Sequence, residues 1–69
     1  MDKADRVRMI TETAALRRAA ADREAAAVTT AIYLEDALDI TIADEVLADD
    51  SLAMRSGVHA VLDALSREH

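Results

Sequence analysis

The chain consists almost entirely of residues that favour helix. It has 69 residues, no proline and one glycine, Gly57. From Ala4 to Ala37 the composition is dominated by alanine, arginine, leucine and glutamate, with few β-branched residues. Proline and glycine disfavour helix most strongly, and alanine favours it most. The sequence therefore predicts an all-α fold, formed by a single domain over residues 1–69.

Residues 5–38 form an alanine-rich segment with helical periodicity. Apolar residues recur in it at steps of three and four, as in an amphipathic helix, and include Val7, Ile10, Val28 and Ile32. One continuous helix would be on the order of 50 Å long, at about 1.5 Å per residue, which is long for so small a domain. Asp22 is the best internal N-cap, with a restart at Arg23. A long Ala-rich N-terminal helix is predicted, either unbroken or divided at Asp22.

The second half predicts shorter elements. Residues 39–42 alternate polar and β-branched side chains, which favours an extended step. Residues 43–48 then predict one short helical turn with carboxylates at its start, where the helix dipole favours them. A last helix is expected from Ser56 or Gly57 to Ser66, with Ser56 as its cap. Its inner face is expected to consist of Val58, Val61, Leu62 and Leu65. The predicted fold is a small bundle of three or four helices.

One run in this half resembles a known family. Residues 34–47 read L-E-D-A-L-D-I-T-I-A-D-E-V-L. This resembles the centre of an acyl carrier protein, typically L-E-x-x-F-x-I-x-I-P-D-E, with departures at Leu38 and Ala43. The matching residues are Leu34, Glu35, Leu38, Ile40, Ile42, Asp44 and Glu45. The resemblance covers roughly residues 28–66 and implies a carrier-like build in the second half of the chain.

The attachment serine of that family has no counterpart at the expected place. Carrier proteins bear phosphopantetheine on a serine at the start of the helix before the acidic run, and this position falls near Glu24 here. A D-S-L sequence does occur at residues 50–52, where Ser51 is more simply a turn or capping residue. The resemblance thus implies a divergent or degenerate carrier-like chain, with phosphopantetheine at Ser51 as an alternative.

Charge is divided unequally along the chain. The net charge is −6, and residues 25–69 carry nine acids against Arg55 and Arg67. An acidic half repels nucleic acid and attracts a basic patch on a partner protein. The predicted partner-binding residues are Glu35, Asp36, Asp39, Asp44 and Glu45. Arginines of the N-terminal half form either a basic strip or, as we prefer, pairs with acids of the same chain.

Function is predicted to be binding rather than catalysis. A thin, alanine-rich core with one aromatic residue offers little material for a catalytic pocket. The sequence has no cysteine and no loop of the calcium-binding type, so it does not suggest a metal site. No apolar run is long enough to span a membrane, so a cytoplasmic protein is expected. The favoured function is a non-catalytic, acyl-carrier-like module that docks on a basic partner. The alternative is a self-associating module in which the apolar stripe pairs with its copy in a homodimer.

Overall fold

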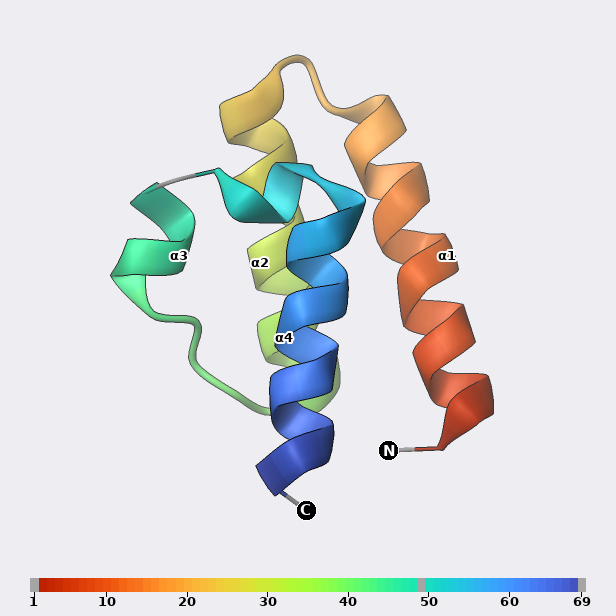
Figure 1. The fold of residues 1–69 in the computed structure, drawn as a ribbon. Coiled ribbons are helices and arrows are strands. Elements are labelled where there is room, and N and C mark those ends of the chain that lie inside the picture. The colour runs from red at the N-terminus through yellow and green to blue at the C-terminus, as the bar shows by residue number, and fades with distance from the viewer. Residues whose placement is uncertain (1, 49, 69) are drawn as a thin grey trace.

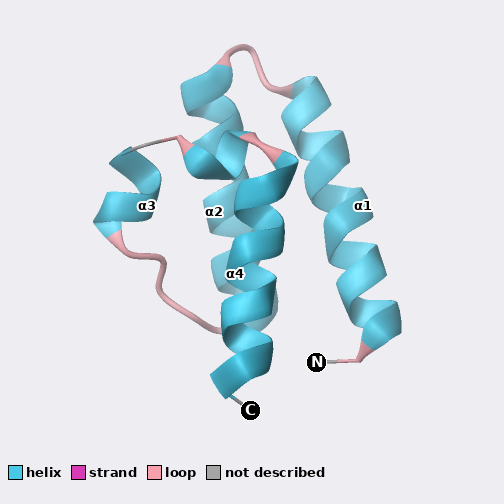
Figure 2. Cartoon of the chain, viewed as in Figure 1, coloured by secondary structure: helices cyan, strands magenta, loops and turns pink. Residues whose placement is uncertain are grey.

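The chain folds into four α-helices and one 3₁₀ turn in the computed structural model, which describes residues 2–48 and 50–68 (Figure 1). The α-helices are α1 (Lys3–Ala19), α2 (Arg23–Leu38), α3 (Asp44–Ala48) and α4 (Arg55–Glu68), and the 3₁₀ turn is η1 (Ser51–Ala53). No strand occurs within those residues (Figure 2). The radius of gyration, 11.1 Å, is that of a compact domain of this length. The prediction of a small all-α bundle is confirmed.

The long N-terminal segment is divided at the predicted place. α1 ends at Ala19, and α2 starts at Arg23 after a short turn and runs back along α1 (Figure 1). Asp22 caps α2, since its Oδ1 accepts the N–H of Ala25 at 2.8 Å. No glycine or proline stops α1. The break allows two short helices to pack against each other, which one rod of the same residues could not do.

Alanine, threonine, methionine and leucine, rather than valine, face the interior of this helix pair. Within α1 and α2 the buried side chains are Met9, Thr13, Ala26, Ala27, Thr30, Ala31 and Leu34. Val7, Val28 and Ile32 are instead 55%, 46% and 57% exposed, so placing them on a face that packs in this chain would be wrong. Of the predicted stripe, Ile10 alone packs against this chain's core. The alanines form a second stripe at the same spacing, and the pairing of the exposed residues with a second chain stays a prediction.

η1 lies at the centre of the fold although it has only three residues. It contacts α2, α3 and α4, and Leu52 at its middle is fully buried. The core joins all parts of the chain and consists of Met9, Ala27, Ala31, Leu34, Ile42, Leu52, Val58 and Leu62. The extended step after α2 contributes Ile42 to it, as the alternation in the sequence predicted.

The start of α4 differs from its prediction by one residue. The helix begins at Arg55, so Ser56 lies in its first turn and is not the cap. Met54 precedes the helix with an extended backbone, and its carbonyl accepts the N–H groups of Gly57 at 3.1 Å and Val58 at 3.4 Å. The predicted inner face is confirmed for three of its four residues, with Val58 and Leu62 buried and Val61 packed against the core. The fourth, Leu65, is half-buried and lines a hollow.

Thr30 carries a defect that predicts a stabilising substitution. Its side chain is fully buried and its hydroxyl has no hydrogen-bond partner among the described residues. A buried hydroxyl without a partner costs about 1–3 kcal/mol. We expect Thr30→Val to raise the free energy of unfolding by about 1 kcal/mol, measured by urea denaturation. Thr13→Val is the matched control, because the equally buried Thr13 hydroxyl donates to the carbonyls of Met9 and Ile10 at 2.7 and 3.1 Å. An equal gain in both variants would contradict the explanation.

Candidate partner-binding groove

The structure separates the five predicted partner-binding carboxylates into different environments. Asp36 is exposed on α2, and Asp39 is exposed just after it. Asp44 and Glu45 are exposed in the first turn of α3. Glu35 is only half exposed and has a role inside the chain. The five residues therefore do not form one uniform acidic surface.

Glu35 holds the extended step against α2. Its Oε2 accepts the N–H of Ile42 at 2.9 Å, and its backbone carbonyl accepts the N–H groups of Asp39 and of Ile40. Asp39 ends α2 in the left-handed region, at φ 54°, which aspartate tolerates better than most residues. Glu35 thus positions the segment that leads to α3 and buries Ile42. Sequence reasoning assigned this carboxylate to the surface and missed its bond to a backbone amide seven residues away.

A groove of about 500 Å³ lies between α2 and the segment from α3 to η1. Its lining consists of Glu24, Val28, Asp44, Leu47, Ala48 and Asp50. Only Asp44 belongs to the five predicted residues. Glu24 and Val28 are one helical turn apart on α2, and that spacing was the one signal in the sequence that could have joined them. Asp50 reaches the groove because its backbone is left-handed, at φ 56°, directly before η1.

The groove combines an apolar floor with unpaired carboxylates. None of Glu24, Asp44 and Asp50 forms an ion pair with a described residue. They do not converge, since the described residues contain no group of three or more potential metal ligands. Separate carboxylates around Val28 and Leu47 suit long basic side chains, whose alkyl stems pack on apolar surface while their charged ends reach the rim.

Ser51 is the first residue of η1 and is half buried. Its Oγ lies 3.4 Å from the carbonyl oxygen of Val46, to which it donates. Glu24, near the position of the family's attachment serine, lies in the first turn of α2 and is exposed. Modification of Ser51 stays a prediction. Its hydroxyl would have to leave the Val46 carbonyl oxygen to react.

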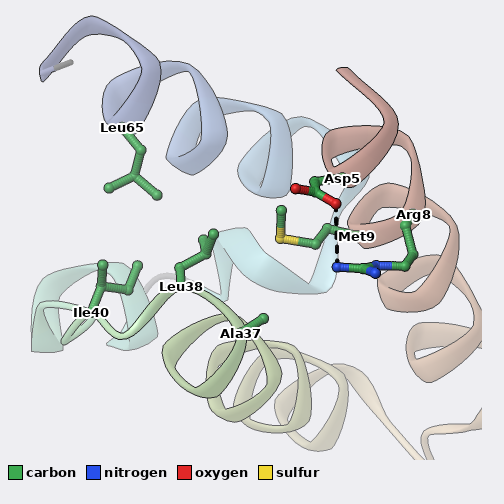
Figure 3. Close-up of a pocket in the computed structure, with 7 residues that line it drawn as sticks. All are labelled: Asp5, Arg8, Met9, Ala37, Leu38, Ile40 and Leu65. Atoms are coloured by element: carbon green, nitrogen blue, oxygen red, sulfur yellow. Dashed lines mark ion pairs between the residues drawn. The ribbon is translucent and has the colours of Figure 1, made fainter. Parts of the chain in front are cut away.

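A second hollow, of about 310 Å³, lies where the N-terminal part of α1 meets the ends of α2 and α4 (Figure 3). Met9, Leu38, Ile40 and Leu65 give it an apolar lining, and its two charged residues, Asp5 and Arg8, pair with each other at 3.5 Å. The charges of this hollow are therefore already balanced, whereas those of the acidic groove are not. The acidic groove, defined by Glu24, Asp44 and Asp50 around Val28 and Leu47, is the better candidate site.

Tyr33 is the only aromatic residue and links the first two helices. Its hydroxyl donates to the Glu12 carboxylate of α1. Burial, and then this bond to Glu12, raise the pKa of Tyr33 to about 12. The phenol stays protonated throughout the physiological range and serves the packing of α1 on α2 rather than acid–base chemistry.

Comparison with known proteins gives no assignment: no family model, curated protein or solved structure matches the chain. Within the part of the chain that the structure describes, no helix is long and apolar enough to cross a membrane.

Proposed function

We propose that this protein is a non-catalytic binding module that docks on a basic partner through the acidic groove. The observation that carries the proposal is a groove lined both by apolar side chains and by three carboxylates that form no ion pair with a described residue. The net charge of −6 adds a long-range attraction to positive partners, which mainly speeds encounter and selects among them. The likeness of residues 34–47 to carrier proteins supports the same kind of interaction, because that family engages its enzymes through an acidic surface.

The partner surface should be apolar at its centre and basic at its edges. Val28 and Leu47 offer contacts only to an apolar group that enters between the carboxylates. Ile32, 57% exposed and one turn along α2 from Val28, extends the apolar contact beyond the groove. An amphipathic helix with leucines flanked by lysines has this character and is the probe we would use.

Two triple variants with the same charge change test the groove. Glu24→Gln, Asp44→Asn and Asp50→Asn together remove three charges from it, while Asp36→Asn, Asp39→Asn and Glu45→Gln remove three beside it. Asparagine tolerates the left-handed backbone at positions 39 and 50. We expect the groove triple to weaken peptide binding tenfold or more, about 1.4 kcal/mol, and the outer triple to weaken it by less than about threefold. Fluorescence anisotropy at about 0.1 M salt measures both, and circular dichroism checks that helicity is kept.

Equal losses in the two triples would mean that only net charge matters and that the groove is not the site. Unchanged binding in both would remove docking through this acidic surface altogether. A peptide with glutamates in place of its lysines is the matched probe, and it should not bind.

Self-association is a second candidate, favoured by the apolar positions that α2 leaves exposed. Val28 and Ile32 are four residues apart, so they share one side of the helix. We expect sedimentation equilibrium to show a dimer that Ile32→Asn converts to monomer. Val7→Asn is the control, because Val7 is similarly exposed but lies on α1. A wild-type protein that sediments as a monomer at high concentration would leave docking on a foreign partner as the explanation for the exposed side chains.

A further inference from the structure

The seam between α1 and α4 gathers positive groups in a chain that is acidic as a whole. The two helices are antiparallel neighbours (Figure 1). His59 of α4 lies between two arginines: its Nδ1 is 3.5 Å from Nη2 of Arg6, and its Nε2 is 3.3 Å from Nε of Arg55. Both nitrogens of the ring therefore face guanidinium groups.

The two ring nitrogens of His59 cannot both form hydrogen bonds with the arginines that they face. A neutral imidazole has one nitrogen that accepts and one that donates, and guanidinium groups only donate. In either tautomer, one of the two contacts places an N–H against an N–H. A protonated ring would oppose both arginines and add a third positive charge. An acceptor from outside the chain would resolve the conflict.

Arg17 adds a further donor without a partner. Its Nη1 is buried, and no described residue accepts a hydrogen bond from it. Burial, followed by the charges of Arg18 and Arg55, lowers the pKa of Arg17 from its usual value. Arg17 lies on α1 and Arg55 on α4, so positive groups of both helices border the seam. A bound anion would supply the acceptor that Arg17 Nη1 lacks.

Few of these groups have a carboxylate partner. In the described part of the chain, Asp63 is the one acid that forms an ion pair with them, and it is paired with Arg6 at 2.6 Å. Arg8 pairs with Asp5 outside it. Among the described residues, Arg17, Arg18 and Arg55 pair with no acid. The preferred reading of the sequence, that arginines pair within the chain, thus holds for Arg6 and Arg8 only.

We propose that this seam, formed by Arg6, Arg17, Arg55 and His59 with Arg18 beside it, binds a phosphate group, free or carried by a small organic molecule. Guanidinium groups suit phosphate because their parallel N–H donors match its oxygens. A phosphate dianion balances two of the unpaired positive charges, where a single carboxylate would balance one. The proposal is independent of the acidic groove, with which the seam shares no residue.

Thermal unfolding with and without phosphate tests the proposal. Inorganic phosphate and glycerol 3-phosphate are the probes, and sodium chloride at equal ionic strength is the reference. We expect either probe to raise the melting temperature by about 8 °C at ten times its dissociation constant. We also expect the His59 ring resonances in NMR spectra to shift and saturate with added phosphate. A response to inorganic phosphate alone would indicate a free anion, and a response to both would indicate recognition of the phosphate group.

Arginine substitutions distinguish a specific phosphate site from a general effect of positive charge. Arg17→Gln and Arg55→Gln should each abolish the phosphate response. In the absence of phosphate Arg17→Gln should not melt lower than the wild type, since it removes a buried donor without a partner. Arg67→Gln, with the same charge change at the far end of α4, should keep the response. The proposal is overturned if chloride gives the same rise, if the His59 resonances do not saturate, or if Arg67→Gln loses as much response as Arg55→Gln.

Discussion

Gly57→Ala should destabilise the protein by about 3 kcal/mol or more, although glycine-to-alanine substitutions in helices usually stabilise by about 1 kcal/mol. A Cβ at position 57 would lie 1.9 Å from the carbonyl oxygen and 2.4 Å from the carbonyl carbon of Ser51. Both are backbone atoms, so no side-chain rotation relieves the clash. The same carbonyl accepts the N–H of Met54 at 3.1 Å, which holds η1 in place. α4 must therefore separate from η1.

The expected fall in melting temperature is about 15 °C, measured by circular dichroism. Ser56→Ala is the control, because it makes a neighbouring exposed position alanine without approaching η1. It should change the stability by less than about 0.5 kcal/mol. A Gly57→Ala variant that melts at or above the wild-type temperature would show that α4 does not approach η1 as closely as described.

Leu52→Ala should cost about 3 kcal/mol, because Leu52 is fully buried at the junction of η1 with α2 and α4. The substitution removes apolar contacts and leaves a cavity that the short 3₁₀ turn cannot close by shifting, since Gly57 already fixes its distance from α4. Among the described residues the core has only eight buried side chains, two of them alanine, so Leu52 is a large share of the buried apolar area.

Met54→Ala is the matched control for that substitution. It also shortens a large apolar side chain, two residues away, but Met54 is 43% exposed. Urea denaturation measures both variants, and Met54→Ala should lower the free energy of unfolding by less than about 1 kcal/mol. If the two variants lost equal stability, η1 would be a surface turn rather than the centre of the core.

The helices themselves were predictable because they depend on local interactions. Helix propensity without proline predicted the class, and Asp22 marked the start of α2 because a capping carboxylate acts within its own turn. The same reasoning predicted the short helix α3 and the inner face of α4. The site was harder to predict. Glu24, Asp44 and Asp50 come from three segments, and only Asp44 was expected in a binding surface.

By itself, the sequence determined the all-α class, marked Asp22 as the best place for a helix to restart, and set how the charge divides between the halves of the chain. It left open whether the helix breaks there, and it gave no sign of η1. Only the tertiary structure decided which side of α1 and of α2 is buried, because alanine and valine stripes repeat with the same period and packing selects between them. Packing also turned Glu35 inward onto the amide of Ile42 and placed Gly57 against Ser51. These contacts join residues from different elements, and their free energy depends on distances that no local pattern encodes.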